Sequence, residues 1–250
     1  MTPALETRGL QKSFGALRVA QDINFALEVG ARHALIGSNG AGKTTFINLI
    51  TGRLKASSGR IMLGGEDVTS LTQEARVKRG LGRTFQINQL FKGLSVLENV
   101  TLAIGEREGV AGDMFRVAGS HRAVVEEAYA LLERLRIADE AERTLRELPY
   151  GRQRLVEIAI ALGLRPKVLL LDEPAAGVPS TESAIILDII DQLPAEIAVL
   201  IIEHDMDLVF RFAKRITVLV QGAILLEGAP AEIAADPRVR EVYLGERQHG

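Results

Sequence analysis

The sequence contains no cysteine, no apolar run of membrane-spanning length and no dense basic run. The lack of cysteine excludes disulfides and thiolate metal sites, and it fits a reducing compartment. A membrane helix needs roughly 18 apolar residues in a row, and a signal peptide needs an apolar core near the N-terminus. Because the sequence shows neither, we expect the protein to be soluble by itself and any membrane role to depend on a partner.

The charge balance gives no electrostatic footprint for nucleic acid. The chain has 30 Lys and Arg side chains against 32 Asp and Glu, a net charge of −2, whereas nucleic-acid-binding domains carry a basic patch or stripe. We therefore predict no nucleic-acid partner. The basic residues near position 80 are interpreted as a solvated face; they are Arg76, Lys78, Arg79 and Arg83.

The 250 residues, 47% of them hydrophobic, are enough to bury a sizeable core, either as one large domain or as a core with a lobe. Residues 4–29 are predicted to form strands, because apolar residues alternate with others near their end. The alternating apolar residues are Ile23, Phe25, Leu27 and Val29. Residues 57–65 and the region about Gln221-Gly222 are predicted hairpins, and a short helical tail closes the chain.

The middle of the chain changes from strand patterns to helical spacing. Apolar residues fall at i, i+4, i+7 and i+11 at Val124, Ala128, Leu131 and Leu135. We therefore predict a helical lobe over residues 92–154. It is inserted into an α/β core made of residues 1–91 and 155–250.

The chain is organised around residues 34–45, where an apolar run stops at a glycine and helical spacing follows. Gly37, four residues, and then Gly42-Lys43-Thr44 form the phosphate-binding loop pattern. Its glycines let backbone N–H groups approach phosphates, Lys43 supplies a cation and the Thr44 hydroxyl can ligate Mg²⁺. A chance glycine-rich turn is the weaker interpretation, because strand and helix patterns flank the loop. The predicted nucleoside triphosphate contacts are Gly37, Ser38, Asn39, Gly40, Ala41, Gly42, Lys43, Thr44 and Thr45.

Two further apolar runs end in polar residues. Residues 167–171 lead into Asp172 and Glu173, and residues 197–202 lead into Glu203-His204-Asp205. Ligands of open α/β sheets gather at the carboxyl ends of strands. Asp172 can therefore hold Mg²⁺ through water, Glu173 can polarise an attacking water, and His204 can donate to a terminal phosphate. A salt-bridged acidic pair is the weaker interpretation of Asp172 and Glu173.

Three other positions carry less specific signals. Gln86 is polar where a short strand ends, so it can reach toward a metal or a water. Phe14 lies just upstream of the nucleotide loop and is either a nucleobase-stacking or a core residue, with the core slightly favoured by the residues alone. Gly151 precedes a helix whose N–H groups can meet an anion, although an ordinary helix start looks the same. The other histidines, His33, His121 and His249, are interpreted as structural or surface residues.

In this order and spacing, the motifs resemble the ATP-binding subunit of an ABC transporter over nearly the whole chain. The matching segments are the Walker A loop at 37–45, the Q-loop glutamine Gln86, the signature at 148–153, Walker B at 169–173, the D-loop position at 175–179 and the switch histidine His204. The resemblance implies a P-loop NTPase core with a mainly parallel sheet, an N-terminal antiparallel β part and an inserted α-helical lobe. It also implies ATP hydrolysis, with ATP and Mg²⁺ as cofactors.

The resemblance also implies roles for individual residues. The implied catalytic residues are Glu173, His204, Gln86 and Lys43, and the implied Mg²⁺ ligands are Thr44, Gln86 and Asp172. In this family an aromatic residue at the place of Phe14 stacks on adenine, so the resemblance favours stacking there. The signature residues Tyr150, Gly151 and Arg152 are implied to contact ATP held by a second ATP-binding subunit.

Within the family, the segments 148–154, 173–177, 202–206 and 243–246 look most like those of branched-chain amino acid importers. Such a system implies transmembrane permease subunits, a second ATP-binding subunit that is identical or different, and indirectly a solute-binding protein. The chain would then lie on the cytoplasmic face of the cell membrane, held there by the permease. The alternatives are the ATPase of a lipid or lipopolysaccharide export system, a soluble ABC ATPase acting on DNA or ribosomes, and a nucleotide-binding regulatory module with little turnover.

Two positions depart from the general family pattern. Pro149 replaces the signature serine and has neither a hydroxyl nor an N–H, and Pro179 replaces the D-loop aspartate. We still expect hydrolysis, because the chain keeps Lys43, Gln86, Asp172, Glu173 and His204.

Overall fold

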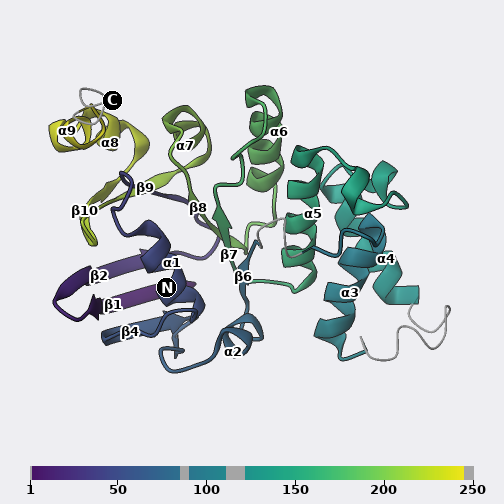
Figure 1. The fold of residues 1–250 in the computed structure, drawn as a ribbon, viewed down its shortest axis with the longest axis horizontal. Helices are drawn as coiled ribbons and strands as arrows, with labels where there is room; N and C mark the ends of the chain where they lie inside the picture. The colour runs from purple at the N-terminus through teal and green to yellow at the C-terminus, as the bar shows by residue number, and fades with distance from the viewer. Residues whose placement is uncertain (1, 85–89, 111–121, 245–250) are drawn as a thin grey trace.

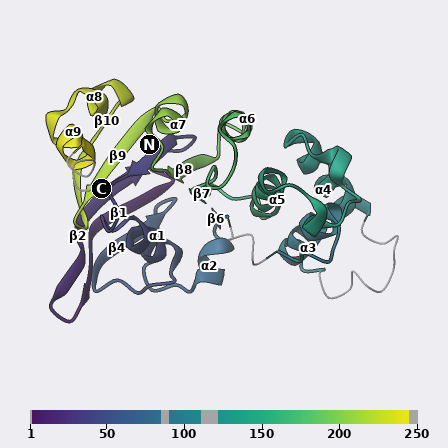
Figure 2. The same ribbon diagram turned by 45° about the horizontal axis from the view of Figure 1, so that its top comes forward.

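Two β-sheets and a group of helices beside them organise the structure, a computed structural model that describes residues 2–84, 90–110 and 122–244 (Figures 1 and 2). The strands are β1 (Leu5–Phe14), β2 (Leu17–Leu27), β3 (Arg32–Ile36), β4 (Ser58–Leu63), β5 (Glu66–Asp67), β6 (Leu81–Arg83), β7 (Val168–Asp172), β8 (Ala198–Ile202), β9 (Arg215–Val220) and β10 (Ala223–Gly228). The helices are α1 (Lys43–Thr51), α2 (Gln73–Val77), α3 (Val96–Glu108), α4 (Arg122–Arg134), α5 (Tyr150–Gly163), α6 (Ser180–Asp191), α7 (Met206–Phe212), α8 (Pro230–Ala235) and α9 (Pro237–Leu244), with 3₁₀ turns at Ala138–Glu140 and Leu145–Glu147.

The first sheet is antiparallel and has the order β2-β1-β4-β5 among the described residues. Along β2, Ile23, Phe25 and Leu27 are buried while the residues between them are exposed, which is the predicted alternation. Val29 was wrongly included in this pattern. The strand ends at Leu27, and Val29 is 58% exposed in the turn that follows.

The second sheet has the order β10-β9-β3-β8-β7-β6 and is parallel except for β10 at its edge. Its central strands β3 and β8 are buried throughout, as expected for parallel strands covered on both faces. Together with the antiparallel sheet and the helices on one side, this arrangement confirms the predicted fold class.

Successive residues of the central strands belong to two different apolar clusters, because side chains alternate between the faces of a strand. Leu169 and Leu171 pack in a cluster that continues into α3, α4 and α5. Val168 and Leu170 pack in a cluster shared with α1 and the antiparallel sheet. The parallel sheet therefore separates two apolar cores.

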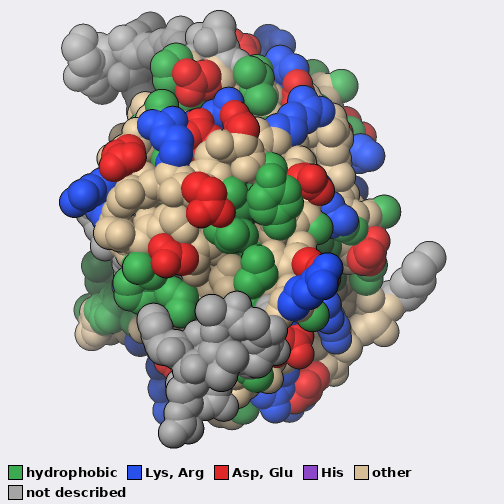
Figure 3. Space-filling model, turned by 90° about the vertical axis from the view of Figure 1, so that its right-hand side faces the viewer, with side chains coloured by type: hydrophobic (Ala, Val, Ile, Leu, Met, Phe, Trp, Pro, Cys, Tyr) green, Lys and Arg blue, Asp and Glu red, His purple; other side chains and the backbone are tan. Residues whose placement is uncertain are grey.

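Helices α3, α4 and α5 lie side by side at the right of Figure 1. Helix α3 begins at a capping box, in which Ser95 accepts from the Glu98 N–H and Glu98 accepts from the Ser95 N–H. Arg107 ties α3 to its neighbours by donating to the Gly163 carbonyl and to Glu127. The lobe face in Figure 3 intersperses acidic and basic side chains rather than presenting one sign of charge.

The interpretation of the basic residues near position 80 as one solvated face was wrong for two of the four. Arg76 is 2% exposed, and its guanidinium donates to the carbonyls of Leu49, Ile50, Thr69 and Leu71. Leu49 and Ile50 lie in the last turn of α1, where carbonyls lack the usual donor four residues later. The Leu49 carbonyl also accepts from the N–H of the C-cap residue Gly52. Arg76 therefore serves as a buried cap of α1. Arg83 is also largely buried, and its partners belong to the candidate site.

No helix in the described ranges combines the length and the apolar character that crossing a lipid bilayer requires.

Candidate functional site

The phosphate-binding pattern forms the loop between β3 and α1. A Cβ atom at Gly37 would lie 2.4 Å from the Leu219 carbonyl oxygen of β9, so only glycine fits beside that strand. Gly42 caps α1 with φ of 103°, a left-handed conformation that favours glycine. The loop glycines thus fix a narrow turn at the N-terminus of α1, where unpaired N–H groups favour an anion.

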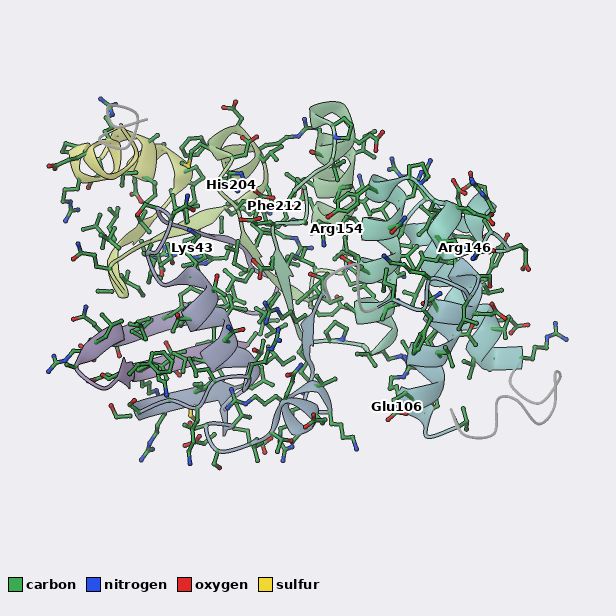
Figure 4. All side chains as sticks on the ribbon, in the orientation of Figure 1. Lys43, Glu106, Arg146, Arg154, His204 and Phe212 are labelled. Carbon is green, nitrogen blue, oxygen red and sulfur yellow. The ribbon has the colours of Figure 1, made fainter. Side chains whose placement is uncertain are left out.

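The Lys43 ammonium lies over this loop (Figure 4). Its Nζ donates to the carbonyl oxygens of Gly37, at 2.5 Å, and Ser38, at 2.9 Å. The charge is therefore held at the loop itself, where it can meet the outer phosphates of a nucleotide. The remaining predicted contacts lie in the same turn or at the start of α1, and Asn39, Gly40 and Thr44 are exposed there.

Asp172, Glu173 and His204 meet at the carboxyl edge of the parallel sheet. Strands β7 and β8 pair in parallel, which puts Asp172 opposite Ile202 and the following residues next to one another. Glu173 has φ of 47° and donates its N–H to the Ile202 carbonyl at 2.9 Å. The His204 Nδ1 lies 3.5 Å from a Glu173 carboxylate oxygen, and both side chains are substantially exposed. A carboxylate and an imidazole thus face the space at this edge of the sheet, as the chemistry of an attacking water requires.

Glu203 is a functional candidate that the sequence analysis did not single out. Its side chain is 2% exposed and accepts from the N–H groups of Ala175 and His204. Burial raises the pKa of its carboxyl, although these N–H groups oppose the shift. Glu203 therefore holds together the chain segments that carry Glu173 and His204. Its position beside His204 at the end of a buried strand was the only available signal.

Arg83 is the second residue that the sequence analysis missed. At the end of β6, its Nη2 lies 3.0 Å from the Asp172 carboxylate, and its Nη1 donates to Asn48 Oδ1 of α1 at 3.2 Å. The Arg83 side chain is 18% exposed. Asp172 is thus paired with a cation from the neighbouring strand.

The oxygen donors beside the loop suit Mg²⁺. This ion prefers oxygen ligands and is commonly held by one or two carboxylates together with substrate phosphates. The Thr44 hydroxyl and the Asp172 carboxylate are such donors. Within the described part of the chain, no group of three or more His, Cys, Asp or Glu side chains could hold a metal ion. Gln86, the third predicted ligand, lies outside the described residues.

The signature segment lies elsewhere, at the start of α5. Pro149 precedes the helix without a side-chain cap, and Gly151 is buried against Glu182 of α6, whose Oε2 would be 2.6 Å from an added Cβ. Arg152 donates to the Arg136 carbonyl at 2.8 Å. In Figure 4, Lys43 and Arg154, which follows the signature on α5, lie on different parts of the molecule. One chain therefore does not bring its signature to its own phosphate loop.

Tyr150 contacts both its own helix and the D-loop position. Its ring is 42% exposed and lies against Gly177 of the segment between β7 and α6. Its hydroxyl accepts a hydrogen bond from Arg154 at 3.0 Å. The signature and the segment that follows Glu173 are therefore in direct contact within one chain.

Phe14 ends β1 and is 53% exposed, so the interpretation as a core residue was wrong. The Lys12 ammonium lies 4.8 Å from the centroid of its ring. An exposed aromatic ring is available for stacking on a nucleobase, which stays a prediction. Of the other histidines, His33 is buried and bonded to Thr217, as expected of a structural residue, while His121 and His249 lie outside the described residues.

Comparisons with known proteins agree with this geometry. The family model of the ABC transporter matches residues 20–176, and the model of the branched-chain amino acid ATP-binding cassette transporter matches residues 223–249. The chain is 38% identical to the high-affinity branched-chain amino acid transport ATP-binding protein BraF of Pseudomonas aeruginosa and 36% identical to LivG of Escherichia coli K12, which is described in the same words. In both cases 98% of each protein is covered.

Solved structures show the same similarity in three dimensions. An ATP-binding cassette of an ABC transporter in its ADP conformation gives a TM-score of 0.87 at 33% identity, covering 98% of this chain and 100% of that one. A nucleotide-free cassette from an ABC transporter gives 0.85 at 33% identity, covering 96% and 98%. By sequence, fold and the residues gathered at the sheet edge, this chain belongs to the ABC transporter family.

Proposed function

We propose that this protein is the ATP-hydrolysing subunit of an ABC importer for branched-chain or related amino acids. The observation that carries the proposal is the placing of the predicted site residues at one edge of the parallel sheet. The loop that holds Lys43 follows β3, Asp172 ends β7 and His204 follows β8, and these are neighbouring parallel strands. His204 lies 3.5 Å from Glu173. The amino-acid cargo is supported by the names of the relatives and by the second family match. Import of the solute itself belongs to other subunits.

In the proposed reaction, Lys43 and the loop N–H groups bind the ATP phosphates, and Phe14 stacks on adenine. Thr44, Asp172 and Gln86 would hold Mg²⁺, which neutralises charge on the phosphates when bound. Glu173 accepts a proton from the attacking water, and His204 orients the terminal phosphate by donating a hydrogen bond. The contact of His204 with Glu173 supports their action as a unit.

The separation of the signature from the phosphate loop supports a dimer in which each ATP lies between two copies or two related subunits. The signature of the second subunit would offer the Gly151 amide and the positive end of its helix dipole to the γ-phosphate. Pro149 supplies neither a hydroxyl nor an N–H, so these backbone groups carry the contact. Closure of the dimer would exclude bulk water and align Glu173 with the attacking water.

The proposed partners are the permease subunits, a second ATP-binding subunit and, through the permease, a solute-binding protein. This places the chain at the cytoplasmic face of the membrane as a peripheral subunit. The Q-loop side of the lobe is the proposed permease contact. There Phe91, next to the lobe, is 62% exposed.

The test is reconstitution of the protein with candidate permease subunits in vesicles. We expect ATPase activity to rise when the matching binding protein is added with leucine, isoleucine or valine. Stimulation of the ATPase activity by a lipid-handling complex instead would show that the protein belongs to an export system. Recovery of the native protein from cells only with ribosomes or DNA would overturn transport altogether. The matched control is Glu173→Gln, which keeps the fold and removes the group that polarises water.

A further inference from the structure

Arg83 forms an ion pair with Asp172, the carboxylate that the proposed Mg²⁺ site needs. Its Nη2 lies 3.0 Å from Asp172 Oδ2, which is hydrogen-bonding distance. Both side chains are partly sheltered, with 18% of Arg83 and 35% of Asp172 exposed. A charge-assisted contact of this kind uses oxygen lone pairs that would otherwise face a metal ion or its water.

The second partner of Arg83 ties it to the other side of the site. Asn48 lies four residues after Thr44 on α1, so the two side chains share one face of the helix. Since the Arg83 Nη1 donates to Asn48, the guanidinium spans α1 and the end of β7. These are the two elements that carry Thr44 and Asp172, the predicted Mg²⁺ ligands.

The backbone position of Arg83 keeps it there. Strand β6 pairs in parallel with β7 and sets Arg83 opposite Leu170, two residues before Asp172. By contrast, Arg79 pairs with Glu66 and has a more exposed side chain. The two arginines are close in sequence and equal in charge, but only Arg83 points to the site.

We propose that Arg83 is a positioning residue that competes with Mg²⁺ for Asp172. Without the ion, Arg83 holds Asp172 and α1 in place. When Mg²⁺ binds with the nucleotide, Nη2 leaves the carboxylate while Nη1 keeps its bond to Asn48. The competition weakens the hold on Mg²⁺ and favours its release with the product. This inference rests on the proposed function, since that function supplies the Mg-nucleotide.

The test measures binding of a fluorescent ADP analogue, first in EDTA and then as Mg²⁺ is titrated, so no turnover is required. In Arg83→Met, we expect ADP affinity in EDTA to change less than twofold. We expect the Mg²⁺ concentration that gives half of the maximal change in ADP-analogue binding to fall about tenfold. This is the order of effect expected from losing one hydrogen bond to a charged group. Arg83→Lys should give a smaller fall, because its ammonium still competes for Asp172, although it cannot bridge both partners as a guanidinium does.

Arg79→Met is the matched control and should match the unchanged protein in both titrations. If Arg83→Met does not fold, Arg83→Gln removes the same charge while keeping a donor for Asn48. An unchanged or raised Mg²⁺ requirement in the folded variant overturns the competition, even though nucleotide binding stands. If the unchanged protein binds no ADP under either condition, the proposed function fails, and the role of Arg83 fails with it.

Discussion

At the scale of single residues, helix α5 carries a buried ion pair between Arg154 and Glu157. Arg154 donates to the Glu157 carboxylate at 2.8 Å, and the Glu157 side chain is 1% exposed. Glu157 Oε1 and Arg154 Nε are buried without hydrogen-bond partners. Burial raises the pKa of Glu157 to about 7, although Arg154 opposes the shift.

This raised pKa predicts a stability that falls with pH. A carboxyl with a folded-state pKa of about 7 and an ordinary unfolded value of 4.5 binds more protons when folded. Its contribution is therefore present at low pH and is lost as the pH rises through about 7. We expect the free energy of unfolding in urea to fall between pH 5 and pH 8. The fall should be larger in the unchanged protein than in Glu157→Gln, which has no carboxyl to titrate at this position, by on the order of 3 kcal/mol. Equal losses in the two proteins would contradict the assignment.

Individual side chains were the hardest features to predict. Lys43, Asp172 and Glu173 could be placed because each follows an apolar run or a glycine pattern that fixes its position in the fold. Arg76 and Arg83 could not, because a charged residue near other charged residues is usually solvated, and only tertiary packing showed their buried partners. The exposure of Phe14 likewise depends on where the hairpin of β1 and β2 projects.

At the scale of elements, the end of α1 depends on an arginine from outside the helix. Arg76 supplies donors to two carbonyls of the last turn of α1 and to two carbonyls of the segment between β5 and α2. Burial lowers the pKa of this guanidinium, and Asp67 partly offsets the effect. The helix that carries Lys43 and Thr44 is thus anchored at its far end by a residue from α2.

Arg76→Met should therefore destabilise the protein by about 3 kcal/mol or more, because buried carbonyls lose their donors. Arg79→Met, in the turn that follows α2, is the matched control. Its surface pair with Glu66 should contribute less than about 1 kcal/mol. Denaturant unfolding of both variants measures the difference. Similar free energies of unfolding would show that water replaces Arg76 without cost.

The type and order of most elements followed from the sequence, because their patterns are local. Period-2 alternation located β2, continuous apolar runs located β7 and β8, and helical spacing located α4. The end of β2 was missed, since Val29 continues the alternation although the chain turns after Leu27. The division of the chain at residues 92 and 154 stays a prediction, and α5 runs across the second boundary.

At the scale of the whole molecule, the distance between signature and phosphate loop predicts association driven by nucleotide. Glu173→Gln lacks the carboxylate that polarises water, so ATP bound between two copies should persist. We expect Mg-ATP to convert this variant from monomer to dimer in size-exclusion chromatography with light scattering. The double variant Lys43→Ala, Glu173→Gln should stay monomeric, because it loses the cation that binds phosphate. A Glu173→Gln protein that stays monomeric at high concentration with Mg-ATP would contradict the dimer.

Because the parallel sheet separates the two apolar clusters, we expect local unfolding to occur separately on its two faces. Leu170 and Leu171 are adjacent on β7 but lie in different apolar clusters. Leu171→Ala would leave a cavity and should speed amide hydrogen exchange first in α3 and α5. Leu170→Ala should speed it first in β1 and α1. Equal acceleration on both sides would mean that the clusters open together. If the expected result is found, removing the side chain of Leu170 or of Leu171, one residue apart, would loosen opposite sides of the same sheet.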